Sequence, residues 1–356
     1  MSHSFVLRYS TLLSGIVMSV LLVSCGGGSG GSDSGDSSRT SSVSLRFSDA
    51  PVEDAAKVVI TVDAITFSRD GADIVVNTFT SDELGIENAE TFQIDLLEVQ
   101  GNDNRLVLDV VELPVGDYRD LRIRVLDEDI NFSYVEEVGT GLLKPIKVPS
   151  NELKLGAFTV ANTGSQTFVI EFGLRQSLVY NPTPERYILK PRGVRIVDLD
   201  TATTLAGTVD LVQLHAPGGC SDKPDPTVGN VAYLYTGHDL DTANLGDVFI
   251  REGDEEPASS EESTDGPVFD PDAPAEVIAP HAVAEIDGAD GSYLFSYLLS
   301  GDYTLALSCA AEQDDPVIYD GLLIPFPATE IVEITLGIEE NRRCDFPLSD
   351  GACSND

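Results

Sequence analysis

The sequence predicts an all-β fold, and three observations support that prediction. Beyond Ser42, apolar and polar residues alternate with a period of two along most of the chain. Turn-forming groups such as Asp70-Gly71 and Asn162-Thr163-Gly164 separate the alternating segments. No segment carries the sustained apolar stripe of an amphipathic helix. We therefore expect strands that bury one face and leave the other solvated, as in a sandwich.

The first 24 residues have the pattern of a signal peptide. A polar start with Arg8 leads into an apolar run from Thr11 to Val23, which is shorter than the roughly 20 apolar residues of a spanning helix. The following Leu22-Val23-Ser24-Cys25 resembles the lipobox of bacterial lipoproteins. That resemblance implies cleavage before Cys25, lipidation of Cys25 and attachment to a lipid bilayer. The alternative is an ordinary secretory signal with an accidental cysteine.

Residues 25–42 are rich in Gly and Ser and have little to bury, so we expect a flexible tether. Gly26, where lipoproteins retained in the inner membrane carry Asp, implies the outer membrane, facing either the periplasm or the outside. The 60 acidic and 21 basic residues give a formal charge of −39. This charge excludes nucleic acid as a partner, because a phosphate backbone requires clustered Lys and Arg.

Residues 43–200 form the first predicted domain. Its alternating segments predict strands at Val43–Phe47, Val59–Phe67, Phe92–Leu96, Tyr118–Leu126, Gln166–Phe172 and Tyr187–Val197.

Residues 203–340 form the second predicted domain. Strands are expected at Leu205–Leu214, Val231–Tyr235, Val283–Ile286, Tyr293–Leu298, Tyr303–Ser308, Val317–Ile324 and Ile331–Leu336. An insertion over residues 251–276 is dense in Asp, Glu, Ser and Pro, which predicts a mobile acidic loop. Residues 341–356 remain as a C-terminal tail.

Several short pieces in the first domain, in a fixed order, carry a family resemblance. They are Ser48-Asp49-Ala50-Pro51, Val59-Ile60-Thr61-Val62, Phe92-Gln93-Ile94-Asp95-Leu96-Leu97, Leu113-Pro114-Val115-Gly116-Asp117-Tyr118 and Tyr187-Ile188-Leu189-Lys190-Pro191. Over about residues 43–198 the chain resembles the exported bacterial lipoproteins grouped as domain of unknown function 4382. The resemblance implies a fold and a location, and no activity.

A second resemblance concerns Gly291-Ser292-Tyr293-Leu294-Phe295 and the turn Ser300-Gly301-Asp302 that follows. This part is similar to carboxypeptidase-regulatory-like and transthyretin-like sandwiches. The two resemblances together imply two Ig-like or prealbumin-like β-sandwich domains. Modules of the second kind act as structural or binding accessories.

Four cysteines remain beyond Cys25, and an even number in an exported chain favours disulfides. Of the three possible connectivities, we favour Cys220 with Cys309 and Cys344 with Cys353. The absence of a C-x-x-C pair makes a zinc site by these thiols the weaker interpretation.

One acidic segment has the oxygen ligands that Ca²⁺ prefers. Asp239, Asp241, Asn244 and Asp247 lie within ten positions, although the segment lacks the terminal Glu of an EF-hand loop. Asp127-Glu128-Asp129 and Asp287-Gly288-Ala289-Asp290 are lesser candidates. The alternative is a set of solvated acidic loops that keep the chain soluble. His215, His238 and His281 have no metal-ligand spacing, so we expect no required cofactor.

No catalytic constellation is evident in the sequence, and we expect no enzymatic activity. The leading hypothesis is a non-enzymatic, membrane-anchored lipoprotein of the cell envelope that binds an envelope protein or a glycan through exposed loops. One alternative is an envelope hydrolase or carbohydrate-active enzyme that uses paired carboxylates. Another is a Ca²⁺-dependent adhesin or surface-assembly component.

Overall fold

The computed structural model describes residues 39–50, 55–216, 220–251, 269–312, 314–347 and 353–355. All of them belong to one compact unit, Ser38–Asp356. The predicted signal peptide, Cys25 and most of the predicted tether lie outside the described residues, as does most of the predicted acidic insertion. Within the described ranges, no helix is long and apolar enough to cross a membrane.

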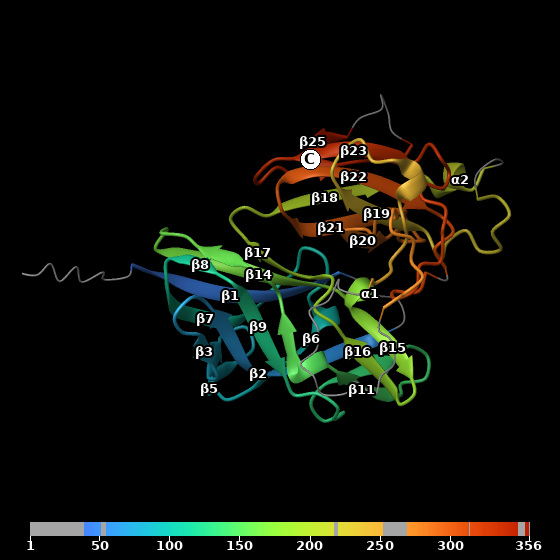
Figure 1. Cartoon of the computed structure of the whole chain (residues 1–356). Helices are drawn as coiled ribbons and strands as arrows, with labels where there is room; N and C mark the ends of the chain where they lie inside the picture. The colour runs from blue at the N-terminus through green and yellow to red at the C-terminus, as the bar shows by residue number, and fades with distance from the viewer. Residues whose placement is uncertain are drawn as a thin grey trace, which may run out of the picture. The chain divides into compact units, whose positions relative to one another are not determined.

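The predicted all-β class is confirmed, because nearly every described element is a strand and the strands form sheets. The sheets fall into two groups, which we call the N-terminal lobe (residues 40–198) and the C-terminal lobe (residues 203–355). In Figure 1 the strands coloured blue to green make the first group and those coloured yellow to red the second. No strand pairing between described residues joins the lobes. The domain boundary near residue 200 stays a prediction.

The first sheet of the N-terminal lobe is built around its first strand. In sheet order it contains β17 (Val194–Asp198), β14 (Ser165–Gly173), β1 (Thr40–Ala50) and β7 (Arg105–Pro114). Strand β1 pairs in parallel with β14 and antiparallel with β7. Because β1 begins at Thr40, the last residues of the predicted tether belong to the sheet.

The second sheet of this lobe is larger. In sheet order it contains β12 (Glu152–Lys154), β9 (Asp120–Val125), β2 (Ala55–Ser68), β10 (Tyr134–Glu137), β11 (Leu143–Lys147), β16 (Glu185–Leu189) and β15 (Leu178–Pro182), with β3 (Ile74–Val76) and β6 (Phe92–Asp95) on β2. Two small pairs complete the lobe: β13 (Phe158–Val160) with β8 (Gly116–Tyr118), and β4 (Phe79–Ser81) with β5 (Ile86–Ala89). The short helices are η1 (Leu96–Glu98), η2 (Pro149–Asn151) and α1 (Leu174–Ser177).

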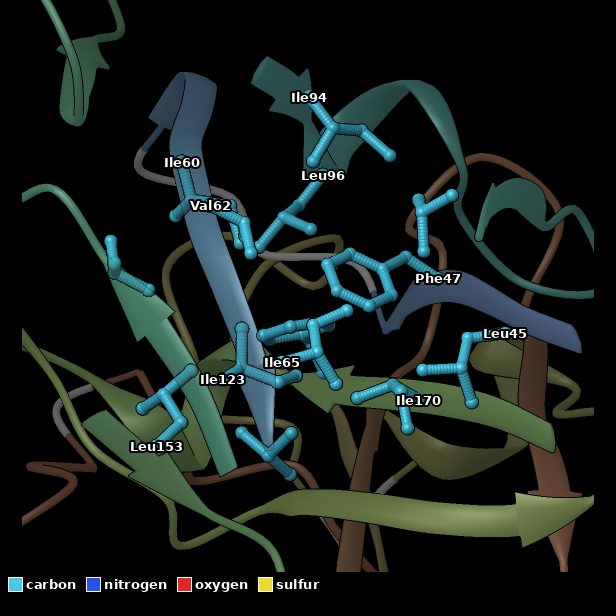
Figure 2. Packing of buried hydrophobic residues seen from close by; sticks show 14 of the residues in the cluster. Leu45, Phe47, Ile60, Val62, Ile65, Ile94, Leu96, Ile123, Leu153 and Ile170 are labelled. Carbon is cyan, nitrogen blue, oxygen red and sulfur yellow. The ribbon is translucent and has the colours of Figure 1, made fainter. Parts of the chain in front are cut away.

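The core of the N-terminal lobe lies between the two sheets. Alternate residues of β1, including Leu45 and Phe47, point inward, as do Ile60 and Val62 of β2 and Ile170 of β14. Figure 2 shows the phenyl ring of Phe47 among aliphatic side chains from the facing sheet. Burial of this one face, at roughly 25 cal/mol per Å² of apolar surface, determines the register of the strands, since a slip of one residue would expose every core side chain.

The C-terminal lobe also contains two sheets. One contains β21 (Ser292–Leu298), β18 (Thr203–Thr208), β24 (Arg342–Arg343) and β25 (Ser354–Asn355). The other contains β20 (Ala282–Glu285), β19 (Val231–Thr236), β22 (Gly301–Ser308) and β23 (Ile331–Leu336). Helices α2 (Leu211–Leu214) and η3 (Thr242–Asn244) lie in the connections. The predicted tail, residues 341–356, therefore supplies β24 and β25 to this lobe.

Four predicted strands differ from the structure. Tyr118–Leu126 is divided between β8, which ends at Tyr118, and β9, which begins at Asp120. The segment Tyr187–Val197 is divided into β16 and β17, because Pro191 and Gly193 interrupt it, and Gly193 has a φ of +78°. In Leu205–Leu214 the strand ends at Thr208, and Asp210 caps a short helix with its side chain.

The predicted strand Val317–Ile324 is wrong, since no strand pairing forms there. Carboxylates accept the hydrogen bonds that a neighbouring strand would accept. Asp315 accepts from the Val317 amide at 2.8 Å, and Asp270 accepts from the Tyr319 amide at 3.0 Å. Asp247 accepts from the Leu322 amide at 2.9 Å. The apolar residues of the segment had indicated a strand, yet side-chain carboxylates accept from several of its backbone amides.

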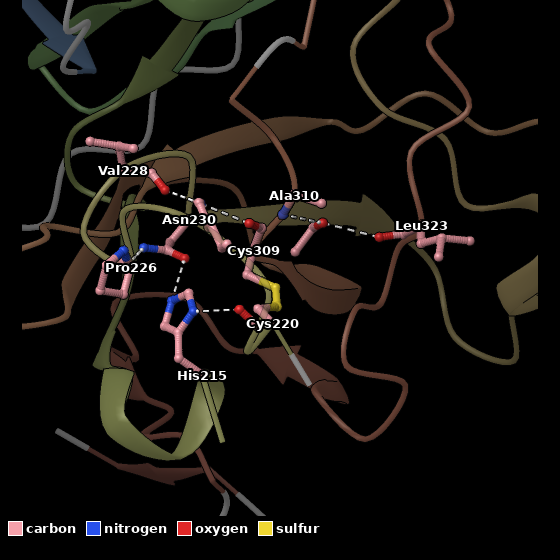
Figure 3. The surroundings of a disulfide bond; sticks show 10 residues. His215, Cys220, Pro226, Val228, Asn230, Cys309, Ala310 and Leu323 are labelled. Carbon is pink, nitrogen blue, oxygen red and sulfur yellow. Dashed lines mark hydrogen bonds between the residues drawn. A yellow bond between two sulfur atoms is a disulfide. The ribbon is translucent and has the colours of Figure 1, made fainter. Parts of the chain in front are cut away.

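Two disulfides join cysteines of the C-terminal lobe. Cys220 pairs with Cys309 and Cys344 pairs with Cys353, the connectivity that the sequence favoured. Figure 3 shows the His215 ring beside the first bridge, where Nδ1 lies 3.1 Å from the Cys220 carbonyl oxygen and Nε2 lies 3.3 Å from Asn230 Oδ1. The first bridge spans 89 residues of sequence and the second spans 9.

The difference in loop length predicts unequal contributions to stability. Loop-closure entropy predicts a loss of about 4 to 5 kcal/mol in unfolding free energy for Cys220→Ala/Cys309→Ala, and about 2 to 3 kcal/mol for Cys344→Ala/Cys353→Ala. Urea unfolding of both double variants beside the wild type measures the two values. An equal or larger loss in the second variant would contradict the prediction.

Candidate binding site

A surface pocket of about 450 Å³ opens in the N-terminal lobe. It lies where β2 and β9 meet the loop that follows β9 and the short helix η2. The side chains and backbone that line it belong to Asp63, Arg124, Val125, Leu126, Asp127, Asp129, Phe132 and Asn151. The pocket therefore combines carboxylates, a guanidinium, an amide and one aromatic ring.

A bulge in β2 positions Asp63 at the pocket. Val62 and Ala64 pair with Val125 and Arg124, so Asp63 is an extra residue on its strand. Its Oδ1 accepts a hydrogen bond from Arg124 Nε at 2.7 Å, which is also an ion pair. The bulge thus brings a carboxylate and a guanidinium together at the edge of the pocket.

The loop from Leu126 to Ser133 is bound to β2 through Thr61. The Leu126 amide donates to the Thr61 carbonyl at 2.9 Å, and the Thr61 hydroxyl donates to the Phe132 carbonyl at 2.6 Å. The Thr61 amide donates to Ser133 Oγ at 3.0 Å, and that hydroxyl donates to the Leu126 carbonyl at 2.6 Å. These hydrogen bonds attach both ends of the loop to the sheet.

The innermost acid of the pocket is Asp127, whose side chain is 5% exposed. Its Oδ2 accepts from the Val148 amide at 2.8 Å and lies 3.3 Å from Lys147 Nζ. Lys147 also donates to Asn151 Oδ1 at 3.2 Å. Asp127 therefore has a structural role in joining β11 to the loop as well as a position in the pocket wall.

Backbone geometry around the pocket is unusual. Glu128, Ser150 and Asn151 all have φ values between +57° and +60°, in the left-handed region that most side chains avoid. Such residues need support from their surroundings, and Glu128 has it: its amide donates to the Ile146 carbonyl at 2.7 Å, and its carboxylate accepts from Arg186 at 2.6 Å.

Chemically, the pocket can accept hydrogen bonds and cover an apolar surface. Carboxylate oxygens accept from hydroxyl or ammonium groups, and the Phe132 ring, 42% exposed, offers a flat apolar wall. Arg124 can donate as well. The arrangement suits a small polar ligand with an apolar part.

The structure does not bring the predicted calcium ligands together as one acidic site. No three His, Cys, Asp or Glu side chains of the described ranges form a group able to hold an ion. Asp241 caps η3 through the Ala243 amide at 3.0 Å, and Asp239 has a φ of +54°. Asp247 is buried and accepts from backbone amides of the segment around Leu322. Asn244 lies within η3.

The lesser candidates have different outcomes. Asp127 and Asp129 line the pocket, whereas Asp287 and Asp290 shape a turn by accepting from the Ala289 and Ser292 amides at 2.6 and 2.9 Å. Asp63, Arg124 and Asn151 could not be identified from the sequence, because the bulge and the left-handed turn appear only after the strands pair. The apolar residues Ile130 and Phe132 beside Asp129, in an otherwise polar stretch, were the available signal.

The three histidines occupy separate positions. His215 is near the first disulfide, and His238 Nε2 lies 3.1 Å from the Ile334 carbonyl oxygen. Burial and, to a lesser extent, the charge of Arg195 together lower the pKa of His281 to about 4. His281 is therefore neutral near pH 7.

Two buried carboxyl groups of the N-terminal lobe lie outside the pocket. Both carboxylate oxygens of Asp49 on β1 are buried, and so is Oε2 of Glu171 on β14. Burial raises the pKa of Asp49, and the charge of Glu171 adds to the effect. Burial raises the pKa of Glu171 to about 7, although Arg195, opposite it on β17, acts in the other direction.

The raised pKa of Glu171 predicts a pH dependence of stability. Between the ordinary value of 4.5 and about 7, the folded chain holds a proton that the unfolded chain releases. The unfolding free energy should therefore fall as pH rises through this window, by up to about 3 kcal/mol from this group. Urea unfolding from pH 4.5 to 8 should show that Glu171→Gln removes this part of the decline.

Glu90→Gln serves as the matched control, because Glu90 is exposed. Its pH profile should follow that of the wild type. A Glu171→Gln profile parallel to the wild type would contradict the assignment of the buried proton to Glu171.

Comparison with solved structures finds matches of very low similarity. The Bacillus anthracis TIE protein is 11% identical, with 86% of this chain and 33% of that chain covered and a TM-score of 0.18. GBS52, the minor pilin of Streptococcus agalactiae, is 12% identical, with coverage of 85% and 94% and a TM-score of 0.18. BcpA, the major pilin subunit of Bacillus cereus, is 9% identical, with coverage of 86% and 70% and a TM-score of 0.18.

This chain thus spans about a third of the Bacillus anthracis protein. TM-scores of this size support no transfer of function. No curated protein matches the chain. Residues 40–191, which contain the pocket and most of the N-terminal lobe, match the family model described as Domain of unknown function (DUF4382).

Proposed function

We propose that this chain is a lipid-anchored, non-enzymatic binding module of the bacterial cell envelope, and that its ligand occupies the pocket around Asp129 and Phe132. The observation that carries the proposal is the pocket itself, whose walls combine polar groups with an exposed ring on a loop bound to the sheet. A site that is ordered before binding loses less free energy to ordering when a ligand arrives.

The location in the proposal comes from the sequence. The signal-like first 24 residues and the lipobox-like Leu22-Val23-Ser24-Cys25 favour an acylated N-terminus in the outer membrane. A Gly- and Ser-rich segment then separates the lipid from the sheets. Such a tether lets the pocket reach a partner at some distance from the bilayer.

The anchor is tested by labelling. Cells that express the full chain and are grown with radioactive palmitate should yield a labelled protein. The Cys25→Ala variant should carry no label. Cys344→Ala/Cys353→Ala is the control, since it removes two other cysteines and should keep the label. A labelled Cys25→Ala protein would contradict the proposed anchor.

The pocket is tested by titration calorimetry of the full chain with two probes, the peptide acetyl-Leu-Lys-Leu-amide and cellotetraose. Phe132→Ala should weaken whichever probe binds by about fivefold or more, because an exposed ring in a binding site contributes more than 1 kcal/mol. The backbone contacts of Phe132 to Thr61 remain in this variant. Tyr180→Ala is the matched control, as Tyr180 is also 42% exposed.

Two results would contradict the proposed function. Equal affinities of Phe132→Ala and wild type would place the ligand elsewhere, and hydrolysis of cellotetraose by the purified chain would favour the hydrolase alternative. Failure of both probes to bind would also count against a pocket of this chemistry.

A further inference from the structure

In the ranges that the structure describes, two of the three carboxylates that line the pocket have a cationic partner, and the third does not. Asp63 is paired with Arg124 at 2.7 Å, and Asp127 has Lys147 at 3.3 Å. Asp129 has no ion-pair partner among the described residues, although it lines the pocket. The pocket thus retains one carboxylate whose charge nothing in the described part of the chain neutralises directly.

The two oxygens of Asp129 are not equivalent. Its Oδ1 accepts from the Asn131 amide at 2.9 Å and from Asn131 Nδ2 at 2.7 Å. No hydrogen bond to its Oδ2 is present among the described residues. One oxygen is therefore used to hold the turn, and the other is open to a ligand.

The turn also sets the neighbour of this oxygen. The Phe132 amide donates to the Asp129 carbonyl at 2.9 Å, which closes a turn from Asp129 to Phe132. Both residues line the same pocket. A ligand that reaches the open oxygen therefore has an apolar surface next to it.

A second observation concerns Asp127, the less exposed carboxylate of the pocket wall. Asp127 is nearly buried and lines the pocket, yet its Oδ1 accepts no hydrogen bond from any described residue. This oxygen is not among the fully buried atoms without a partner, so water or a ligand can reach it and donate to it. Asp127 therefore offers the ligand a second acceptor in the same pocket.

We propose that the pocket takes the primary ammonium group of a lysine side chain from a partner protein, with the nitrogen at Asp129 Oδ2 and the carbon chain along the Phe132 ring. This inference rests on the proposed function. A guanidinium prefers to bind both oxygens of a carboxylate as a fork, and Asp129 offers only one. An ammonium is a compact point charge that can contact a single oxygen while its other N–H groups donate to water or to a second acceptor, and its four-carbon stem packs on apolar surface.

The overall charge agrees with this choice. A chain of net charge −39 repels anions and attracts cationic segments, so association with a lysine-bearing partner is steered electrostatically. Added salt weakens such an attraction.

The experiment uses the full chain and titration calorimetry with acetyl-Leu-Lys-Leu-amide, the same peptide acetylated on the lysine nitrogen, and the arginine analogue. The lysine peptide should bind at least about fivefold more tightly than either analogue. Asp129→Asn should weaken the lysine peptide by about five- to tenfold and leave the acetylated peptide unchanged.

Asp129→Asn keeps an oxygen that can accept from the Asn131 amide, so the turn is preserved. The matched control is Asp225→Asn, because Asp225 is exposed and likewise accepts from an amide two residues later, that of Thr227 at 2.9 Å. Asp225→Asn changes net charge equally and should leave binding of the lysine peptide unchanged. An equal loss in both variants would overturn the assignment to Asp129.

Other results separate this inference from the proposed function. Binding of cellotetraose that Phe132→Ala weakens, without binding of the lysine peptide, would overturn the ligand class and leave the binding module intact. n-Pentylammonium that binds as tightly as the lysine peptide would overturn the protein source, since the peptide backbone would then add nothing. An affinity for the lysine peptide that stays constant between 50 and 300 mM salt would overturn the ammonium contact.

Discussion

The hydrogen bonds between Thr61 and the loop from Leu126 to Ser133 are the contacts on which the pocket depends. A loop at the end of a sheet carries backbone groups without strand partners, and these need other partners when they are buried. Thr61 uses its amide, carbonyl and hydroxyl for this purpose. Its neighbours Ile60 and Val62 are buried in the core, so β2 cannot shift without disrupting the packing. The packed core therefore restrains β2, and β2 restrains the loop that carries Asp129 and Phe132.

The C-terminal lobe meets the same requirement with acids. Amides between residues 317 and 322 donate to carboxylates of Asp247, Asp270 and Asp315, where a strand would use a neighbour's carbonyls. Tyr233 adds a hydroxyl contact to the buried Asp314 at 2.8 Å. A segment rich in acids can therefore be structural. The spacing of Asp239 to Asp247 indicated an ion site in the sequence. In the structure, Asp247 instead accepts hydrogen bonds from backbone amides.

Elements with strict alternation could be predicted from the sequence. Strands β1, β2 and β14 extend only a few residues beyond their predicted bounds, because one buried face determines both period and register. β10 and β11 were not predicted, since Tyr134–Glu137 and Leu143–Lys147 show no clean alternation and are positioned by pairing with β2 and β16. The site residues also divide into those that the sequence indicates and those that only strand pairing brings together. Asp127 and Asp129 stand out in the sequence as acids in a loop, whereas Asp63 and Arg124 meet only because β2 contains a bulge.

The acidity of the chain sets a limit on what an unpaired carboxylate can mean. With 60 acidic residues and 21 basic ones, many acids must lack an internal cation wherever they lie. The missing partner of Asp129 is therefore not distinctive by itself. Its setting is distinctive, because one oxygen is held by Asn131 and the other opens onto a pocket beside Phe132. An exposed acid elsewhere is satisfied by water, which reorients freely around it. Next to an apolar wall fewer waters can do so, and a ligand that brings both a charge and a carbon chain replaces them at both surfaces at once.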